Sequence, residues 1–384
     1  MDMFKLILKI ILYALPAGLV FLFPAYVYWQ AHEFITPQQV VALQNEPQQV
    51  LFGLAYDDFE KAYKLELVSQ RDPQVIALGA SRVMEFRGFF FNPGVSFVNA
   101  SRFVAFGGVD GFGGTKDLVR FVQALPKQVH PQIIIVGLDP WMFAPGQDAG
   151  HITEQPTLFS QIKAFFSGEW RKPYDDYFHN KFTLSDLAMY APDSHTIGLT
   201  ALIKHNGYLN DGSYYQGSWV EHPDLPALKA LIATHKASAQ DRSTLEYGDS
   251  VSAQALVNLR EFLQLSKERN VYVVGFITPF PESIHDQIMS VHDVHWSSER
   301  ELTRDIAATF KDFDFNFLDT SDPRTEGIQE TEFLDESHTT DKGSLRILIY
   351  MAQRDKTLQH YVSLSALQTL LKETPGPFIV KNIH

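Results

Sequence analysis

A serine, an aspartate and a histidine stand at positions in this chain from which they could carry out nucleophilic catalysis. Ser81 ends the apolar segment Val75–Ser81, which is typical of a buried parallel strand. Asp335 and His338 are three residues apart, so the carboxylate could accept a hydrogen bond from the imidazole. A serine hydroxyl is a good nucleophile only when a base takes its proton and a third group orients that base. We therefore predict Ser81 as the nucleophile, His338 as the base and Asp335 as the group that orients it.

Both segments also have simpler structural interpretations. Ser81 could cap the N-terminus of a helix, a position that serine favours. Asp335 could likewise cap the last helix beside a surface histidine. The catalytic interpretation is favoured because both segments are expected at the carboxyl edge of the same sheet, where open α/β sheets bind their ligands.

Acyl transfer also needs hydrogen-bond donors that face the developing oxyanion. Asn99 ends a second predicted strand, and Gly107 and Gly108 follow in the next loop, where glycine lets a backbone N–H approach a ligand or simply makes the loop flexible. Asp139 ends a third strand and could place a polar side chain at the far wall of the site. Arg82 could bind an anionic substrate group or pair with an acidic side chain.

Strands and helices alternate from residue 75 onward and would position these residues. The predicted strands cover 75–81, 95–99, 133–138, 271–277 and a fifth strand around 313–317. The predicted helices cover 116–125, 253–269, 301–310 and 344–351. This alternation predicts an α/β fold with three layers, in which a parallel sheet carries helices on both faces.

An insertion over residues 141–252 interrupts this alternation and is rich in aromatic side chains. It could be an irregular segment stabilised by its own aromatics, or a lid whose rings stack on sugars. The aromatic residues in question are Trp141, Trp170, Tyr174, Tyr177, Phe178, Tyr214, Tyr215 and Trp219.

The amino terminus predicts a transmembrane helix within residues 1–34. No charged residue occurs from Ile10 to Ala31, a length sufficient to cross the ~30 Å hydrocarbon core. Lys5 and Lys9 precede the apolar run and the next basic residue is Lys61, so the positive-inside rule places the remainder of the chain outside the cytoplasm. A cleaved signal peptide is the alternative, but the segment lacks a small-x-small cleavage site.

The remaining chain is predicted to comprise two parts. Residues 35–70 form a stalk with a lead-in helix over about 52–65, whose apolar face packs on the domain. Residues 71–384 form the α/β domain with its insertion. Tyr26, Tyr28 and Trp29 are expected at the outer membrane interface as an aromatic belt.

Composition excludes several classes of function. The net charge of −13 disfavours nucleic-acid binding, which needs clustered Lys and Arg. The absence of cysteine excludes disulfides, thiolate catalysis and cysteine–zinc sites. His292 and His295 lack a nearby third ligand, so we expect no metal site there, and we expect no cofactor.

Together these segments resemble the four sequence blocks of the SGNH (GDSL) hydrolases, over about residues 75–352. The resemblance implies a flavodoxin-like parallel sheet, a Ser81–His338–Asp335 triad, and Gly107 or Gly108 as an oxyanion donor. The first block has Ala80 where the family has aspartate. Asp139 stands where the family has its oxyanion asparagine, and a carboxylate there would repel an oxyanion unless it were protonated or turned away.

Within that superfamily, the chain looks most like membrane-tethered proteins of cell-envelope acylation, such as the teichoic acid D-alanyl-transfer protein and polysaccharide O-acetyltransferases. This resemblance implies an acyltransferase or esterase on the outer side of a bacterial inner membrane, beside a multi-spanning membrane-bound O-acyltransferase. Its Ser81 would receive an acyl group, such as acetyl, and pass it to an envelope glycan. The alternative is a catalytically silent scaffold that binds glycan or docks the acyltransferase.

One further segment is similar to a motif of alginate-type O-acetyltransferases. Asp293-Val294-His295-Trp296 matches their Asp/His string, but in that family the string precedes the serine block, whereas here it follows it. We therefore interpret Trp296 as a core residue and His292 and His295 as surface residues.

Overall fold

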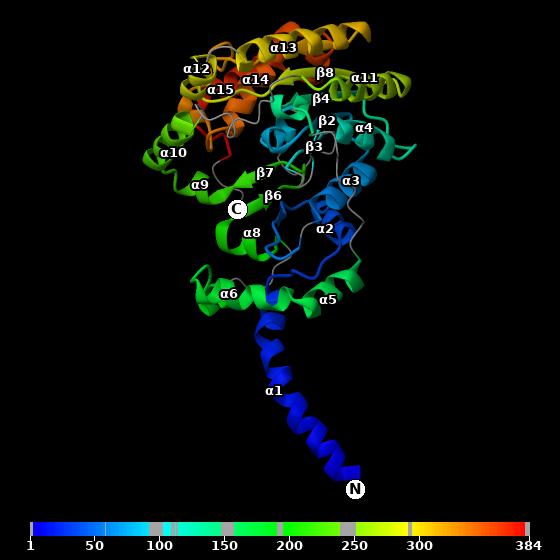
Figure 1. The fold of residues 1–384 in the computed structure, drawn as a ribbon, viewed down its shortest axis with the longest axis vertical. Coiled ribbons are helices and arrows are strands. Elements are labelled where there is room, and N and C mark those ends of the chain that lie inside the picture. The colour runs from blue at the N-terminus through cyan, green and yellow to red at the C-terminus, as the bar shows by residue number, and fades with distance from the viewer. Residues whose placement is uncertain are drawn as a thin grey trace.

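The structure is a computed structural model of the full chain. It describes residues 3–57, 59–91, 103–108, 112, 114–146, 157–189, 195–238, 251–290 and 294–380. The described chain forms two sheets with helices around them, and one long helix projects from this body (Figure 1).

The larger sheet is parallel and has five strands in the order β3-β2-β4-β8-β9, which confirms the predicted parallel sheet. The strands are β2 (Val75–Leu78), β3 (Phe103–Phe106), β4 (Ile133–Leu138), β8 (Tyr272–Ile277) and β9 (Asn316–Leu318). Counted along the chain, this order is 2-1-3-4-5, the flavodoxin-like order, whose switch point lies between the first and third strands, here β2 and β4. Ligands of such sheets bind beyond the carboxyl ends at that point.

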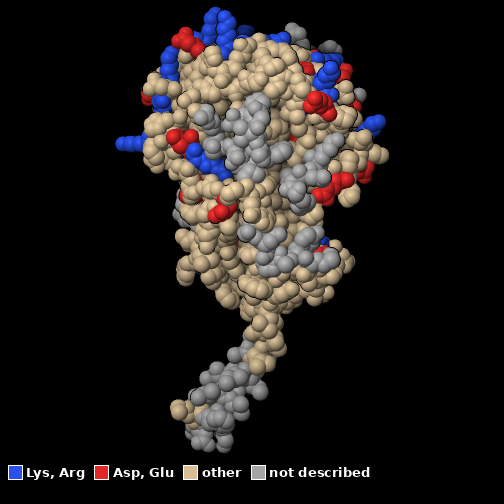
Figure 2. All heavy atoms as spheres, turned by 180° about the vertical axis from the view of Figure 1, so that it is seen from behind, with Lys and Arg blue, Asp and Glu red and all other residues tan. Residues whose placement is uncertain are grey.

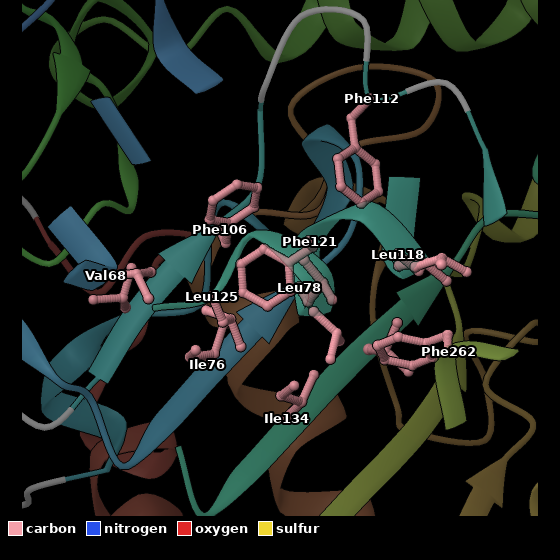
Figure 3. Close-up of a cluster of buried hydrophobic side chains, with 14 of the residues drawn as sticks. Val68, Ile76, Leu78, Phe106, Phe112, Leu118, Phe121, Leu125, Ile134 and Phe262 are labelled. Atoms are coloured by element: carbon pink, nitrogen blue, oxygen red, sulfur yellow. The ribbon is translucent and has the colours of Figure 1, made fainter. Parts of the chain in front are cut away.

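Helices cover both faces of this sheet, so the fold has three layers as predicted. Alternate strand residues point to opposite faces: Ile76 and Leu78 join one apolar cluster, whereas Val75 and Ala77 join the other. The first face is covered by α4 (Thr115–Ala124), α11 (Ala253–Glu268) and α13 (Val294–Asp312). The second is covered by α14 (Asp341–Arg354) and α15 (Leu364–Glu373). Figure 3 shows the first cluster, where Phe121 and Phe262 pack over the strands.

Two predicted segments differ from the structure. The strand beside β2 is β3 at Phe103–Phe106, and the predicted strand at 95–99 lies outside the described residues. The lead-in helix begins later than predicted, because residues 51–52 form strand β1 (Leu51–Phe52) and helix α3 covers Glu60–Arg71. The chain enters this region through α2 (Pro37–Gln44), which Thr36 caps.

The insertion supplies a second, smaller sheet in the order β5-β1-β6-β7. Its other strands are β5 (Thr196–Ile197), β6 (Asn206–Tyr208) and β7 (Tyr214–Gln216), and none of them was predicted. Helix α8 (Leu199–Lys204) packs beside this sheet and α9 (Gly217–Glu221) follows its last strand. The next helix, α10 (Leu225–Ser238), packs on α12 (Glu282–Ser290), which follows β8 of the larger sheet. A hydrogen bond of 2.8 Å from the Tyr214 N–H to the Met84 carbonyl joins this sheet to the segment that follows β2.

The long projecting helix is α1 (Met3–Gln30), and its C-terminal end enters the body between α5 (Leu158–Ser167) and α6 (Lys172–Phe178), with α7 (Leu184–Met189) following (Figure 1). In the part of the chain that the structure describes, no helix combines the length and apolar character of a membrane span, so the predicted transmembrane helix is not supported. Tyr28 is buried and stacks on Tyr56, so the prediction that it lies in an aromatic belt is wrong.

Several aromatics of the insertion hold α1 in place. Trp170 packs edge-on against Phe21, and Tyr174 and Tyr177 contact Phe23, with ring centroids 4.9–5.3 Å apart. The hydroxyl of Tyr174 also donates to a backbone carbonyl of α1 at 2.9 Å. These aromatics therefore pack on α1, outside the insertion, a role that neither interpretation of the insertion included.

Candidate active site

Ser81 begins a short 3-10 helix, η1 (Ser81–Val83), three residues after β2 ends at Leu78. Val83, at the end of this turn, is fully buried where three neighbouring strands end. A Cβ atom added to Gly79, Gly107 or Gly137 would contact a methyl group of Val83, at 2.9 Å and 2.6 Å for the first two. The three glycines therefore leave the space in which Val83 anchors the turn, and this anchor fixes the position of Ser81.

The Ser81 hydroxyl contacts the imidazole of His338. Ser81 Oγ lies 2.6 Å from His338 Nε2, although the two residues are 257 positions apart in the sequence. This distance is within the range expected between a nucleophile and its general base. The two segments thus meet as the sheet-edge argument predicted.

The other ring nitrogen of His338 contacts Asp335, so its hydrogen bond selects the tautomer that leaves Nε2 facing the serine. Nδ1 lies 2.7 Å and 2.9 Å from the two Asp335 carboxylate oxygens. Oδ1 of Asp335 also accepts the backbone N–H groups of Ser337 and His338, each at 2.8 Å. An isolated bridge between Phe333 and Thr339 closes this turn. The carboxylate is thereby oriented by the backbone of the same turn.

These contacts keep the Asp335 carboxyl ionised. Burial alone raises its pKa, but the hydrogen bond and positive charge of the His338 ring, together with the two backbone N–H groups, outweigh burial and lower the pKa to about 2. A charged Asp335 can therefore stabilise an imidazolium that forms on His338.

Arg82 and Asp139 form an ion pair at the switch point between β2 and β4. Arg82 Nε lies 3.3 Å from Asp139 Oδ1, and the same guanidinium donates to Thr278 Oγ1 at 2.9 Å. The Thr278 hydroxyl in turn donates to Asp139 Oδ1, and the guanidinium stacks on the Phe280 ring with its central carbon 4.1 Å from the ring centroid. Of the two roles considered for Arg82, the structure thus shows pairing with an acidic side chain. Asp139 is buried and directed toward this cation.

Gly107 and Gly108 follow β3, the strand next to β2. The Gly108 N–H donates to the Ala80 carbonyl at 3.3 Å, and its φ of +68° suits glycine. The Gly108 carbonyl accepts a hydrogen bond of 2.5 Å from the Tyr208 hydroxyl. The glycine loop is therefore held on one side by the serine turn and on the other by the smaller sheet. Asn99 lies outside the described residues.

Two residues of this site were not among those predicted. Thr278 directly follows β8, so the rule that ligand-binding residues follow parallel strands could have identified it. Tyr208 lies on a three-residue strand of the insertion, and no sequence pattern places its hydroxyl against the Gly108 carbonyl. Of the alginate-type motif, His292 and Asp293 lie outside the described residues, and the backbone of residues 294–296 belongs to α13.

Comparison of the sequence with models of known protein families and with curated proteins finds no match.

Proposed function

We propose that this chain is a serine acyltransferase or esterase of SGNH type, which uses Ser81, His338 and Asp335 as its catalytic triad. The observation that carries the proposal is the 2.6 Å contact between Ser81 Oγ and His338 Nε2, with Asp335 on the other ring nitrogen. No simpler role requires a serine, a histidine and an aspartate to contact one another in this order. A helix cap would need only the backbone around Ser81.

The reaction would proceed through an acyl-enzyme. Ser81 Oγ attacks the acyl carbonyl while His338 Nε2 takes the hydroxyl proton, and the leaving group receives that proton as its bond to the carbonyl breaks. An acceptor hydroxyl then attacks the acyl-serine ester, and its proton passes through His338 to Ser81 Oγ as this second bond breaks. With a sugar hydroxyl as acceptor the result is transfer, and with water it is hydrolysis.

The Gly107 N–H is the oxyanion donor in this proposal. Of the two candidate glycines, Gly108 already donates its N–H to the Ala80 carbonyl. Asp139 is not assigned this role, because a carboxylate would repel an oxyanion and this one pairs with Arg82. Arg82 instead neutralises the Asp139 charge beside the nucleophile.

The resemblance to envelope-acylating proteins supports a glycan as acceptor and a multi-spanning O-acyltransferase as the donor-side partner. We accordingly place the proposed reaction at the extracytoplasmic side of a bacterial inner membrane. Fractionation of cells that express the full chain, with protease applied from the outer side, would test this location. Full protection from the protease would contradict it.

The second candidate function is a glycan-binding scaffold without catalysis, and the Arg82–Asp139 ion pair favours it. Asp139 of this pair stands where the resemblance would place an oxyanion asparagine, and Arg82 directly follows Ser81 in the chain. A scaffold would bind glycan equally well with or without the Ser81 hydroxyl.

One experiment separates the two functions. The full chain and its Ser81→Ala variant are incubated with p-nitrophenyl acetate, and the intact mass is recorded together with the hydrolysis rate. Ser365→Ala, which changes an exposed serine far along the chain, is the matched control. An acetyl adduct or turnover that Ser81→Ala abolishes and Ser365→Ala retains supports the enzyme. Equal behaviour of all three proteins contradicts it and favours the scaffold.

A further inference from the structure

The two helices beside α1 carry apolar side chains that the body does not bury. We call residues 158–178, which comprise α5, the short η5 (Glu169–Arg171) and α6, the collar. On α5, the exposed apolar side chains are Leu158, Phe159, Ile162 and Phe166. Phe159 is 77% exposed and Phe166 is 61% exposed, unusual values for phenylalanine. Phe178 at the end of α6 is 73% exposed.

The exposed apolar residues of α5 share one face. With 3.6 residues per turn, these four positions fall within an arc of about 100° around the helix axis. Phe165 and Gln161 border this arc on one side and are buried against the body. Lys163 borders it on the other side, and Ala164 lies roughly opposite its centre. A helix with an exposed apolar face of this kind can lie in a membrane interface.

The arc faces the side from which α1 projects. Phe165, on the body side, contacts Tyr28 and Phe34, with ring centroids 4.9 Å and 5.6 Å away. Phe166, within the arc, contacts Phe21, which is further from the body along α1, at 5.5 Å. Figure 1 shows α5 and α6 lying across α1 where it leaves the body.

Apolar exposure continues from the arc along α1 itself. Leu15, Leu19 and Leu22 of that helix are each more than half exposed. Figure 2 shows few charged side chains on the visible end of the body next to α1, whereas charged side chains gather at the opposite end. Exposed apolar side chains therefore occur both on the projecting helix and on the collar beside it.

From this arrangement we infer that the collar rests on a lipid bilayer, with the apolar arc of α5 inserted at the boundary between headgroups and acyl chains. Residues 157–189 contain four basic and four acidic residues, so their formal net charge is zero. Insertion would therefore depend on apolar burial and not on anionic lipid. The inference does not rest on the proposed catalysis, because lipid contact and acyl transfer are measured separately.

The test uses the absence of cysteine from the chain, which makes single-cysteine labelling specific. Phe159→Cys and Ile162→Cys place a label on the arc, and Ala164→Cys places the same label on the opposite, exposed side of the same helix. Each full-length variant carries the fluorophore NBD and is mixed with phosphatidylcholine vesicles, with or without nitroxide-labelled acyl chains. We expect blue-shifted emission at the two arc positions, with nitroxide quenching about twofold or more above that at position 164.

Phe159→Asp provides an independent measurement on the unlabelled chain. We expect its partition into phosphatidylcholine vesicles to fall roughly tenfold, because an exposed Phe that enters the bilayer is replaced by a charge. The binding of the parent chain should persist at high salt.

Three results would overturn the inference. The first is equal quenching at all three labelled positions, and the second is no response to vesicles at any of them. The third is a spectral change at positions 159 and 162 that appears without vesicles and rises with protein concentration. That last result would assign the arc to contact with a second copy of the chain.

Discussion

The hydroxyl of Tyr208 donates a hydrogen bond to the carbonyl of Gly108 at 2.5 Å, which connects the smaller sheet to the loop beside Ser81. The buried side-chain nitrogen of Lys64 lies over the same aromatic ring, 4.2 Å from its centroid. The insertion therefore contributes to the candidate site by holding the glycine loop in position.

Removal of this hydrogen bond should slow acyl transfer. In Tyr208→Phe the ring stays but the Gly108 carbonyl loses its donor, which costs about 1–3 kcal/mol if the carbonyl stays buried. We expect kcat for p-nitrophenyl acetate to fall about tenfold with a smaller change in KM, because a misplaced donor weakens binding of the transition state more than that of the substrate. Tyr361→Phe, which removes a hydroxyl bonded to Gln132, is the control. Equal loss in both variants would contradict a positioning role for Tyr208.

Asp335→Asn should remove most of the catalytic rate without moving Ser81. The amide cannot stabilise an imidazolium as the carboxylate does, and losses of about 10⁴-fold in kcat are known for such changes. The measurement is single-turnover acetylation of Ser81 by mass spectrometry. An acetylation rate within a few-fold of the parent would show that His338 acts without Asp335.

The same variant should lose a pH-dependent part of its stability. The Asp335 pKa is lowered to about 2 from its usual 3.8. The stabilisation by the charged carboxylate is therefore complete above pH 3.8 and is lost as the pH falls through about 2. Urea unfolding between pH 2 and pH 6 measures it, and we expect the gap between parent and Asp335→Asn to narrow toward the acid end.

Glu33 should produce the opposite pH dependence. Its carboxyl is buried, and although three backbone N–H groups bond to it, burial prevails and raises its pKa from 4.5 to about 7. Between these two values the folded chain binds a proton that the unfolded chain has lost, so the free energy of unfolding falls as the pH rises from about 4.5 to 7. The glutamine side chain of Glu33→Gln does not titrate. Between pH 4.5 and 7 we therefore expect the unfolding free energy of this variant to change less with pH than that of the parent. An equal pH dependence in both proteins would contradict the raised pKa of Glu33.

The ion pair between Arg82 and Asp139 should make the effects of substituting its two members on stability non-additive. Arg82→Met leaves Asp139 buried without its cation, which we expect to cost about 3–5 kcal/mol of unfolding free energy. Adding Asp139→Asn in the same chain removes the uncompensated charge and should restore much of this loss. Thermal or urea unfolding of the two single variants and the double variant gives the coupling energy. Additive losses would show that the two side chains do not interact.

Much of the larger sheet could be predicted because its signal is local. The runs at 133–138 and 271–277 are apolar throughout and flanked by helical spacing, and β4 and β8 fall on them. The contact between Asp335 and His338 could also be predicted, from their spacing of three residues and their place between the last predicted strand and helix. Ser81 could be matched to His338 because both follow strands at the same edge of the sheet.

The smaller sheet, the partner of Arg82 and the packing of the insertion could not be predicted, because they depend on contacts between segments distant in sequence. The strands of the smaller sheet have two or three residues each, which is too short for a periodic pattern. The partner of Arg82 could not be chosen from sequence, because several acidic residues were available and only the fold brings Asp139 to it. The aromatics of the insertion had two plausible roles, and their packing on Phe21 and Phe23 became evident only from the structure.

The separation of 257 residues between Ser81 and His338 has a consequence for biosynthesis. A ribosome delivers the nucleophile early and its base only near the end, and long-range pairing of this kind forms late in folding. On the proposed chemistry, a nascent or truncated chain that stops before His338 carries Ser81 without its base and does not react with acyl donors. The proposed activity would therefore begin only once the segment that carries His338 has been synthesised and has packed beside Ser81.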